Sequence, residues 1–502
     1  MVKSTIVAAG LLAGASVANA QLGPPSAQKQ FSQEFQDGNS VLKHFGGWGP
    51  YSDRTSYGID RNTPSNCEVD QVFMLMRHGE RYPDAYMGGP MVETYQKIKS
   101  NVKNFVGSLS FLNTWQTTLD DPNMWSQETY SGPYSGLATG YRVGVEYRDR
   151  YGHLWHGNQV PIFTSGYERV INTARRFGEG FFGYNYTDAA FLNIIPEDAT
   201  EGANSLTPTC FAPVNSVPNY EIVSEAELAP FPAFQAAADR LNAENPGLNV
   251  NLTDVYNLML HAPFELNARS SSPWVDVFTL DEWQSFKYMQ SLMYYYLAGP
   301  GLNSTVPAGA VFANATLTAM NQGPDQAGTM FWNFAHDGNI TPVLAALGLL
   351  VPPSDLPTDR IVHDTVYSMS DIVPMGAHLV LERMTCTAPT GASNSTNSTG
   401  SFNSTDSSSD NEDVFVRVLL NEAVLPFEDC QNGPGYSCPL TNYTAKLQST
   451  LVDYAKVCQV PKEYPQYLSF FWDYNQTNSL NYLQGEIASQ LTDTTWDDKP
   501  AA

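Results

Sequence analysis

Basic residues are scarce in this chain of 502 residues. It contains 26 Lys and Arg against 51 Asp and Glu, which gives a formal net charge of −25 at pH 7 and an isoelectric point near 4.5. A protein that binds nucleic acid needs a basic surface, and no basic stripe accompanies the aromatic residues here. We therefore expect no nucleic-acid partner. The overall charge also repels anionic small molecules at neutral pH, so acid medium should favour their binding.

Long apolar runs are missing after the first twenty residues, and none reaches the roughly 18 residues of a membrane span. We therefore expect no membrane partner. Residues 1–20 have Lys3 near their start, an apolar stretch over 6–17, and Ala-Asn-Ala before position 21. This is the pattern of a cleavable secretory signal peptide, so we predict removal after Ala20 and an extracellular or cell-wall location.

Cysteine is also infrequent. An even number of cysteines in a secreted chain predicts disulfides, although the spacing leaves their pairing open. No two cysteines have C-x-x-C spacing and no histidine lies close to them in sequence, which disfavours a zinc site. We expect neither a metal nor a cofactor. The six cysteines are Cys67, Cys210, Cys386, Cys430, Cys438 and Cys458.

The most informative motif is Arg-His-Gly-Glu-Arg-Tyr-Pro at residues 77–83, which follows the apolar run 72–76. A strand that ends in a glycine turn exposes its last side chains at the carboxyl edge of a sheet, where open α/β sheets bind ligands. Arg77 and Arg81 suit phosphate oxygens, and a nitrogen of His78 can attack phosphorus. The alternative is an ordinary strand end with surface arginines and a turn histidine.

A second apolar run, residues 330–335, leads directly into His336 and Asp337. Residues 340–349 then have the apolar spacing of a buried helix, with Pro342 expected in its first turn. One group cannot both attack phosphorus and protonate the departing alcohol, so a second group is needed. Asp337 is the candidate acid, held at a helix N-terminus, and His336 is a further phosphate ligand.

Another His-Asp pair occurs at residues 363–364. It lacks a long apolar run before it and a helical pattern after it. We interpret this pair as part of a solvated loop.

A third segment has the same order of strand, turn and helix. Residues 160–163 are apolar, and the Thr-Ser-Gly turn that follows leads into a helix whose first turn carries Arg169. Free N–H groups at a helix start favour an anion, so we expect Arg169 to contact phosphate. A lone helical arginine is usually solvated, and this is our interpretation of Arg175 and Arg176.

These three segments together resemble the histidine acid phosphatase family, in particular its secreted fungal branch of acid phosphatases and phytases. The resemblance covers nearly all of the chain after residue 20, including residues 416–426. It implies that His78 is the nucleophile and Asp337 the proton donor. The phosphate pocket that it implies consists of Arg77, Arg81, Arg169 and His336. The disulfides that it implies are Cys67–Cys386, Cys210–Cys458 and Cys430–Cys438.

The function that we expect is hydrolysis of small-molecule phosphate monoesters, phytate (myo-inositol hexakisphosphate) among them, through a phosphohistidine and without a metal. Members dedicated to phytate carry extra lysines around the pocket, and Met293 and Tyr294 stand where such a pair would lie. Glu282 either lines the approach as an acidic group or is an ordinary solvated helix residue. Two alternatives are a phosphoglycerate-mutase-like phosphotransferase and a catalytically silent binding protein. A homo-oligomer is left open.

The expected fold is α/β, with a mixed sheet flanked by helices, phosphoglycerate-mutase-like, and a second, mostly helical lobe over the active-site crevice. Tracts 91–109, 254–267 and 279–297 have helical patterns. The α/β domain is predicted to be discontinuous and the lobe to have two parts. The α/β ranges are 21–90, 150–190 and 320–502, and the lobe ranges are 91–149 and 191–319.

The tract 387–413 is rich in Ser, Thr, Asn and Gly, and we predict a glycosylated surface loop there. Asn339 also matches the sequon, but a glycan in the proposed active-site turn would block substrate, so we predict that it is unmodified. The sequons predicted to carry glycans are Asn185, Asn251, Asn303, Asn314, Asn394, Asn397, Asn403, Asn442 and Asn475.

Overall fold

The computed structural model describes residues 40–213, 223–387, 412–474 and 480–481. The predicted signal peptide, most of the predicted loop at 387–413, and the sequons at Asn394, Asn397, Asn403 and Asn475 lie outside these ranges. Of the other sequons, Asn251, Asn303, Asn314 and Asn442 are exposed. Glycan occupancy stays a prediction.

One mixed sheet forms the centre of the described chain, in the order β7-β6-β5-β1-β4-β2-β3-β9, with β8 paired to β6. The four strands β1, β4, β2 and β3 are parallel, and β5 and β6 continue the sheet antiparallel. This confirms the predicted fold class. The strands are β1 (Cys67–Arg77), β2 (Val160–Ser165), β3 (Ala190–Ile195), β4 (Met330–Ala335), β5 (His378–Thr387), β6 (Glu412–Leu420), β7 (Ala423–Val424), β8 (Cys438–Pro439) and β9 (Leu480–Asn481).

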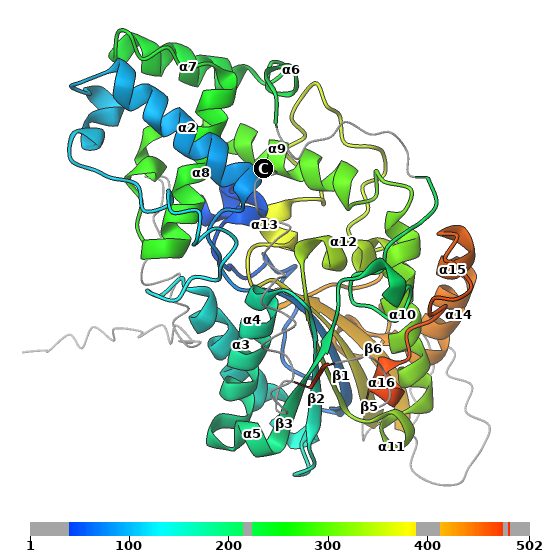
Figure 1. The fold of residues 1–502 in the computed structure, drawn as a ribbon. Coiled ribbons are helices and arrows are strands. Elements are labelled where there is room, and N and C mark those ends of the chain that lie inside the picture. The colour runs from blue at the N-terminus through cyan, green and yellow to red at the C-terminus, as the bar shows by residue number, and fades with distance from the viewer. Residues whose placement is uncertain (1–39, 214–222, 388–411, 475–479, 482–502) are drawn as a thin grey trace, which may run out of the picture.

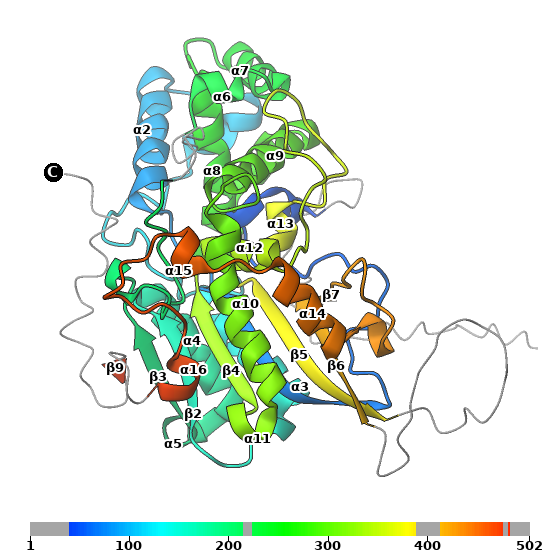
Figure 2. The same ribbon diagram turned by 90° about the vertical axis from the view of Figure 1, so that its right-hand side faces the viewer.

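Helices cover both faces of the sheet (Figures 1 and 2). Strand β1 is apolar at every position from 72 to 76 because alternate side chains enter two different cores. Val72, Met74 and Met76 pack towards α3 (Gly136–Tyr151) and α4 (Glu168–Phe182). Phe73 and Leu75 enter the core that contains α10 (Thr305–Gln322) and α12 (Asp337–Ala346).

A helical lobe lies beyond the carboxyl ends of the parallel strands, with α12 between it and the sheet (Figure 1). Its main helices are α2 (Ala85–Asn101), α7 (Pro232–Glu244), α8 (Leu252–Arg269) and α9 (Leu280–Leu297). The helical tracts predicted at 254–267 and 279–297 are confirmed. Within the predicted lobe ranges, α3, α10 and most of β3 belong to the sheet and the helices on its faces. The division of the chain into two domains stays a prediction.

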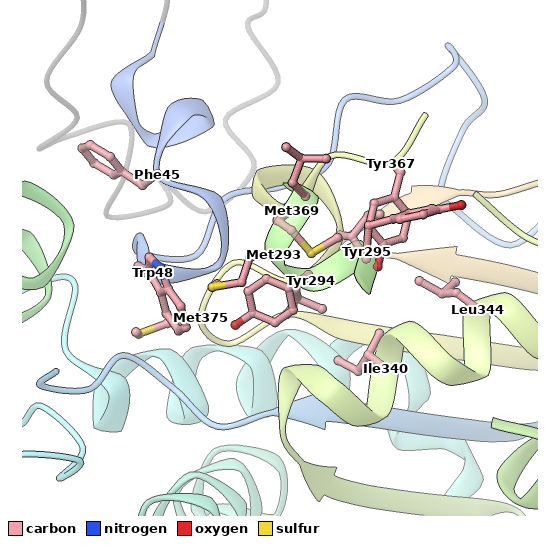
Figure 3. Close-up of a cluster of buried hydrophobic side chains, with 14 of the residues drawn as sticks. Phe45, Trp48, Met293, Tyr294, Tyr295, Ile340, Leu344, Tyr367, Met369 and Met375 are labelled. Carbon is pink, nitrogen blue, oxygen red and sulfur yellow. The ribbon is translucent and has the colours of Figure 1, made fainter. Parts of the chain in front are cut away.

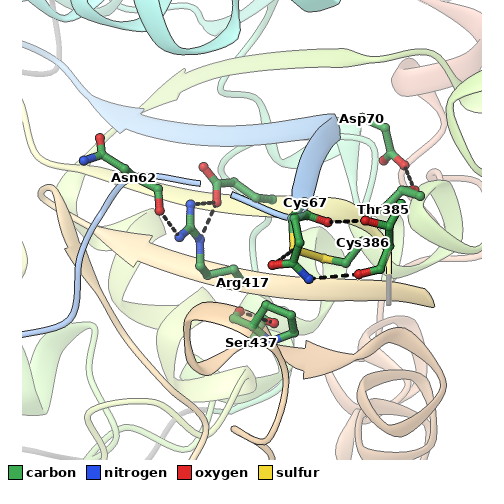
Figure 4. The surroundings of a disulfide bond; sticks show 11 residues. Asn62, Cys67, Asp70, Thr385, Cys386, Arg417 and Ser437 are labelled. Atoms are coloured by element: carbon green, nitrogen blue, oxygen red, sulfur yellow. Dashed lines mark hydrogen bonds and ion pairs between the residues drawn. A yellow bond between two sulfur atoms is a disulfide. The ribbon is translucent and has the colours of Figure 1, made fainter. Parts of the chain in front are cut away.

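All six cysteines form disulfides, Cys67–Cys386, Cys210–Cys458 and Cys430–Cys438, which are the pairs that the resemblance implied. The first of them joins β1 to β5 where the two strands are in register (Figure 4). Across the described ranges, no helix combines the length and apolar character that a membrane crossing requires. The same residues include no group of three or more His, Cys, Asp or Glu that could hold a metal ion.

Candidate active site

The three predicted motif segments meet at one edge of the sheet. Strand β4 lies between β1 and β2 and is parallel to both, with Arg77 beside Ala335 in the register. Parallel strands end at the same edge, so the turns after β1 and β4 and the start of α4 come together. The rings of His78 and His336 are 5.7 Å apart between centroids. Residues separated by more than 250 positions therefore share one site.

His78 immediately follows β1 and is 2% exposed. Its Nδ1 lies 2.8 Å from the carbonyl oxygen of Gly79. Because a carbonyl can only accept, Nδ1 carries the proton and Nε2 keeps its lone pair. Burial lowers the pKa of His78 well below its usual value, and Arg169, Arg77 and Arg81 lower it further. The imidazole is therefore neutral, which is the form that can attack phosphorus.

Arg77 is fully buried, and fixed backbone carbonyls hold its guanidinium group. Nη1 donates to the carbonyls of Gly47 and Val373, both at 2.5 Å. Nη2 lies 2.6 Å from Oδ2 of Asp337. The guanidinium carbon is 5.9 Å from the ring centre of Trp48. Arg77 is therefore positioned before any ligand binds, and Asp337 competes with a ligand for its charge.

Arg81 approaches the same tryptophan. Its guanidinium carbon is 5.7 Å from the ring of Trp48 and 5.9 Å from that of Phe264 in α8. Nη1 donates to the Tyr82 carbonyl at 2.8 Å, and Nη2 contacts Asp84 at 3.1 Å. Trp48, which lies in the cluster of buried hydrophobic side chains in Figure 3, therefore connects the helical lobe with both arginines.

Arg169 lies in the first turn of α4, as predicted. Its guanidinium carbon is 4.6 Å from the ring centre of Tyr167, within the range of a cation–π contact. The Tyr167 ring also packs edge-on against His336 at 5.2 Å. Farther along the helix, Arg176 pairs with Glu179 at 2.6 Å. Tyr167 thus contacts two half-buried candidates for the phosphate pocket, Arg169 and His336.

Asp337 begins α12. Its Oδ2 accepts the hydroxyl of Tyr294 at 2.5 Å besides contacting Arg77, and its Oδ1 accepts the N–H of Gly338 at 2.7 Å. Burial favours the neutral acid, but Arg77, the Tyr294 hydroxyl and His336 outweigh it and lower the pKa of Asp337 to about 2. The carboxyl group is therefore ionised when no ligand is bound.

Two residues that the sequence did not identify as functional belong to this site. Glu197, just beyond β3, has Oε1 at 2.7 Å from Nε2 of His336. Burial would raise the pKa of Glu197, but His336, Ser165 and Arg169 lower it. Tyr294 in α9 contacts Asp337 as described. Glu197 follows an apolar strand run, as the motif residues do, which was an available signal. The resemblance placed Tyr294 near the pocket but gave it no role.

Both interpretations of Glu282 were wrong. The side chain is 4% exposed, caps the start of α9, and pairs with Arg240 at 2.7 Å. It lies in a pocket lined by none of the predicted site residues. Met293 and Tyr294, which occupy the positions expected for a lysine pair, are both 6% exposed. Their side chains lie in the buried cluster of Figure 3.

Two smaller predictions have different outcomes. Pro342 was expected in the first turn of its helix, but α12 begins at Asp337, which places the proline in the second turn. A proline there leaves one carbonyl of the first turn without its usual helical donor.

The pair at residues 363–364 is an exposed turn, which confirms the interpretation as a solvated loop.

Comparison with known proteins gives consistent matches. The family model described as "Histidine phosphatase superfamily (branch 2)" matches residues 68–421. The chain is 35% identical to "Acid phosphatase PHO1" of Komagataella pastoris, over 89% of this chain and 92% of that protein. It is 36% identical to "Phytase PHO112" of Candida albicans, over 87% and 90%.

Solved structures match as well. The crystal structure of the phytase from D. castellii is 31% identical, covers 94% of this chain and 96% of its own, and superposes with a TM-score of 0.78. A multiple inositol polyphosphate phosphatase of Bifidobacterium longum, complexed with inositol hexasulfate, covers 82% of this chain with a TM-score of 0.52. Its identity of 13% limits that likeness to the fold.

Proposed function

Because this chain belongs to the histidine phosphatase superfamily, branch 2, we propose that it is an acid phosphomonoesterase that works through a phosphohistidine at His78. The observation that carries the proposal is the state of this imidazole. It is buried and neutral, it has its lone pair on Nε2, and three arginines lower its pKa. A nucleophile surrounded by cations suits an anionic, electrophilic group such as a phosphate ester.

In the proposed first step the phosphate oxygens are bound by the cationic groups, and Nε2 of His78 attacks phosphorus in line with the ester oxygen. A P–N bond forms, the P–O bond breaks, and its electron pair goes to the departing oxygen. The cations stabilise the oxygens as charge spreads over them in the transition state. The cations are Arg77, Arg81 and Arg169, and His336 is a further proposed phosphate ligand.

Asp337 is the proposed proton donor, and its pKa of about 2 without ligand must be overcome. Arg77 is the largest single cause of that lowering. A phosphate that binds Arg77 neutralises part of its charge and places a new anion near the carboxyl group, and both effects raise the pKa of Asp337. Substrate binding therefore favours protonation of the Asp337 carboxyl group, most readily in acid medium.

The same carboxyl group then completes the cycle. After it protonates the departing oxygen, the Asp337 carboxylate takes a proton from water, which attacks the phosphohistidine and releases inorganic phosphate. His78 is returned neutral. The Asp337 carboxyl group serves first as acid and then as base, so these reaction steps need no metal ion.

We propose a broad substrate range that includes phytate. The relatives with the names acid phosphatase and phytase support both activities. The buried Met293 and Tyr294, in place of lysines, support a pocket without special provision for a highly charged ring.

The test is phosphate release from p-nitrophenyl phosphate and from phytate, in acid buffer that contains a chelator. We expect release from both. If neither substrate releases phosphate, the proposed function is refuted. If the rate on the aryl phosphate is far below that on phytate at every pH, the proposed broad substrate range is refuted.

An extracellular location is also proposed, supported by three disulfides, exposed sequons and the pattern of residues 1–20. Expression in a fungal host should yield enzyme in the medium or cell wall, with an N-terminus at Gln21. Retention of residues 1–20 in an intracellular product would contradict this location.

A further inference from the structure

A buried threonine hydroxyl lies directly behind the His78 turn and contacts three groups. Thr173 in α4 is 0% exposed. Its Oγ1 lies 2.8 Å from the N–H nitrogen of Gly79, 2.5 Å from Oε1 of Glu128, and 2.9 Å from the carbonyl oxygen of Arg169. One hydroxyl thus joins the nucleophile turn, a carboxyl group and the first turn of α4.

These contacts can be tested by counting hydrogens. The N–H of Gly79 can only donate, so Thr173 accepts there, and the carbonyl of Arg169 can only accept. A hydroxyl has a single hydrogen, which cannot serve both that carbonyl and an ionised Glu128. If Glu128 is ionised, the hydroxyl hydrogen serves only one of these two oxygens, and the other oxygen lies close to Oγ1 with no hydrogen between them. If Glu128 is protonated, its O–H donates to the Thr173 hydroxyl, which then donates to the Arg169 carbonyl. Each of the three contacts of Thr173 Oγ1 then has one donor and one acceptor.

The surroundings of Glu128 favour the neutral acid. The side chain is 7% exposed, and its Oε2 is buried without a hydrogen-bond partner among the described residues. A buried carboxylate with one unpaired oxygen is costly. A Cβ atom on Gly136 of α3 would lie 2.5 Å from Glu128 Cγ, so the packing is tight. Burial raises the pKa of Glu128 well above its usual value, and Glu80 raises it further, against the Thr173 contact, the Gly79 N–H and Arg176.

The charged groups that face Glu128 are Glu80 from the turn after β1 and Arg176 from α4. Arg176 is already paired with Glu179. Glu80 accepts the N–H of Tyr51 at 2.9 Å and lies near Arg142 of α3. Burial raises the pKa of Glu80 as well, and its Oε2 also has no hydrogen-bond partner among the described residues, but Arg142, the Thr139 hydroxyl and the Tyr51 N–H oppose that rise. Of the two buried carboxyl groups, Glu80 thus has the stronger support for an anion, whereas Glu128 contacts a hydroxyl.

We propose that Glu128 keeps its proton at the working pH and acts as a positioning residue for the nucleophile and the phosphate pocket. Through Thr173 it ties Gly79, whose carbonyl fixes the tautomer of His78, to the turn that carries Arg169. Its own backbone forms a bridge with Arg81. Through its carboxyl group Glu128 thus connects the segments that carry His78 and Arg169, and through its backbone it contacts Arg81. This inference rests on the proposed function for the role of His78.

The first test compares Glu128→Gln with Glu128→Ala on p-nitrophenyl phosphate across the pH range. The amide of the Glu128→Gln variant can donate an N–H to Thr173 as the neutral acid does, so we expect kcat within about threefold of wild type. The Glu128→Ala variant leaves Thr173 without its donor, and misplacement of a catalytic group can cost about 100-fold in kcat. If Glu128→Gln is as impaired as Glu128→Ala, the anion is required and the proposal is wrong.

A second measurement does not depend on turnover. The infrared spectrum at neutral pH should contain the C=O stretch of a buried protonated carboxyl group, which disappears in Glu128→Gln and persists in the control Glu80→Gln. Absence of that band overturns the proposal even if the enzyme is fully active. A band together with an inactive wild type would refute the proposed function instead.

If Glu128→Gln does not fold, Thr173→Ser and Thr173→Val replace it. Serine keeps the hydroxyl and should retain kcat, whereas valine removes it and should lose activity as Glu128→Ala does. Equal activity of these two variants would contradict the proposed role of the hydroxyl.

Discussion

The two ends of β1 are held in different ways. At its first residue, Cys67 is cross-linked to Cys386 of β5, and close by Asp70 accepts the hydroxyl of Thr385 (Figure 4). Asp70 also pairs with Arg383. At its last residue there is no cross-link, and Arg77 is held by backbone carbonyls and Asp337. One end is fixed by covalent and ionic contacts that serve stability. The other presents charged groups that a ligand can redistribute.

A bound ligand also changes the electrostatic interactions at the functional end of β1. Burial lowers the pKa of His78, and Arg77 lowers it further together with Arg169 and Arg81. Arg77 also lowers the pKa of Asp337, so this one arginine helps to keep His78 neutral and Asp337 ionised. Binding of an anion weakens the influence of Arg77 on both groups, and the pKa of Asp337 rises towards the working range. The comparison predicts that changes at this end alter rates and pH profiles, and that changes at the cross-linked end alter stability.

The largest expected effect comes from His78→Ala. Without the nucleophile no phosphohistidine forms, and kcat should fall by roughly 10⁴-fold or more. Thermal unfolding followed by circular dichroism serves as the control, because the variant should melt near the wild type. Turnover of the His78→Ala variant at the wild-type rate would refute the proposed mechanism.

Asp337→Asn should have the next largest effect, and its size should depend on the leaving group. An alkyl phosphate needs its oxygen protonated and should slow by about 10²–10⁴-fold, whereas p-nitrophenyl phosphate, with a good leaving group, should slow less. The measurement is kcat for both substrates in parallel. Equal losses would show that Asp337 does not donate to the leaving oxygen.

At the other end of β1, the double variant Cys67→Ser with Cys386→Ser should lose stability but little activity. Loss of a native cross-link costs roughly 2–5 kcal/mol, and more for long loops than for short ones. This disulfide spans 319 positions, whereas Cys430–Cys438 spans 8, so replacing the second pair is the matched control. We expect a larger drop in melting temperature for the first pair. A change mainly in kcat would contradict the contrast between the two ends.

The smallest effect is expected for Tyr294→Phe. The hydroxyl of Tyr294 stabilises the carboxylate of Asp337 and so lowers the pKa of that group. Its removal raises this pKa, and the alkaline limb of activity, where Asp337 loses its proton, should move to higher pH by about one unit. The pH profile of kcat, which reports the enzyme–substrate complex, measures the shift. Movement of this limb to lower pH would contradict the assignment of Asp337 as the acid.

The sequence predicted the strand ends better than the supporting contacts. Apolar runs before residues 77 and 336 predicted strands, and parallel strands bring their carboxyl ends to one edge. Glu128 and Tyr294 come from a loop and a lobe helix, and no pattern in the chain indicates which side chains those elements direct to the site. Helix periodicity likewise shows that α3 and α10 have apolar faces, but it does not show that these faces pack on the sheet.

The central claim is that His78 carries the phosphoryl group. The direct test uses Asp337→Asn, in which hydrolysis of the intermediate should be slow, mixed with p-nitrophenyl phosphate and quenched in alkali, where phosphohistidine survives. Mass spectrometry of the digested protein should find one phosphate on the peptide that contains His78, and none when His78→Ala is added. A phosphate on another residue, or phosphate release without any labelled peptide, would contradict the account.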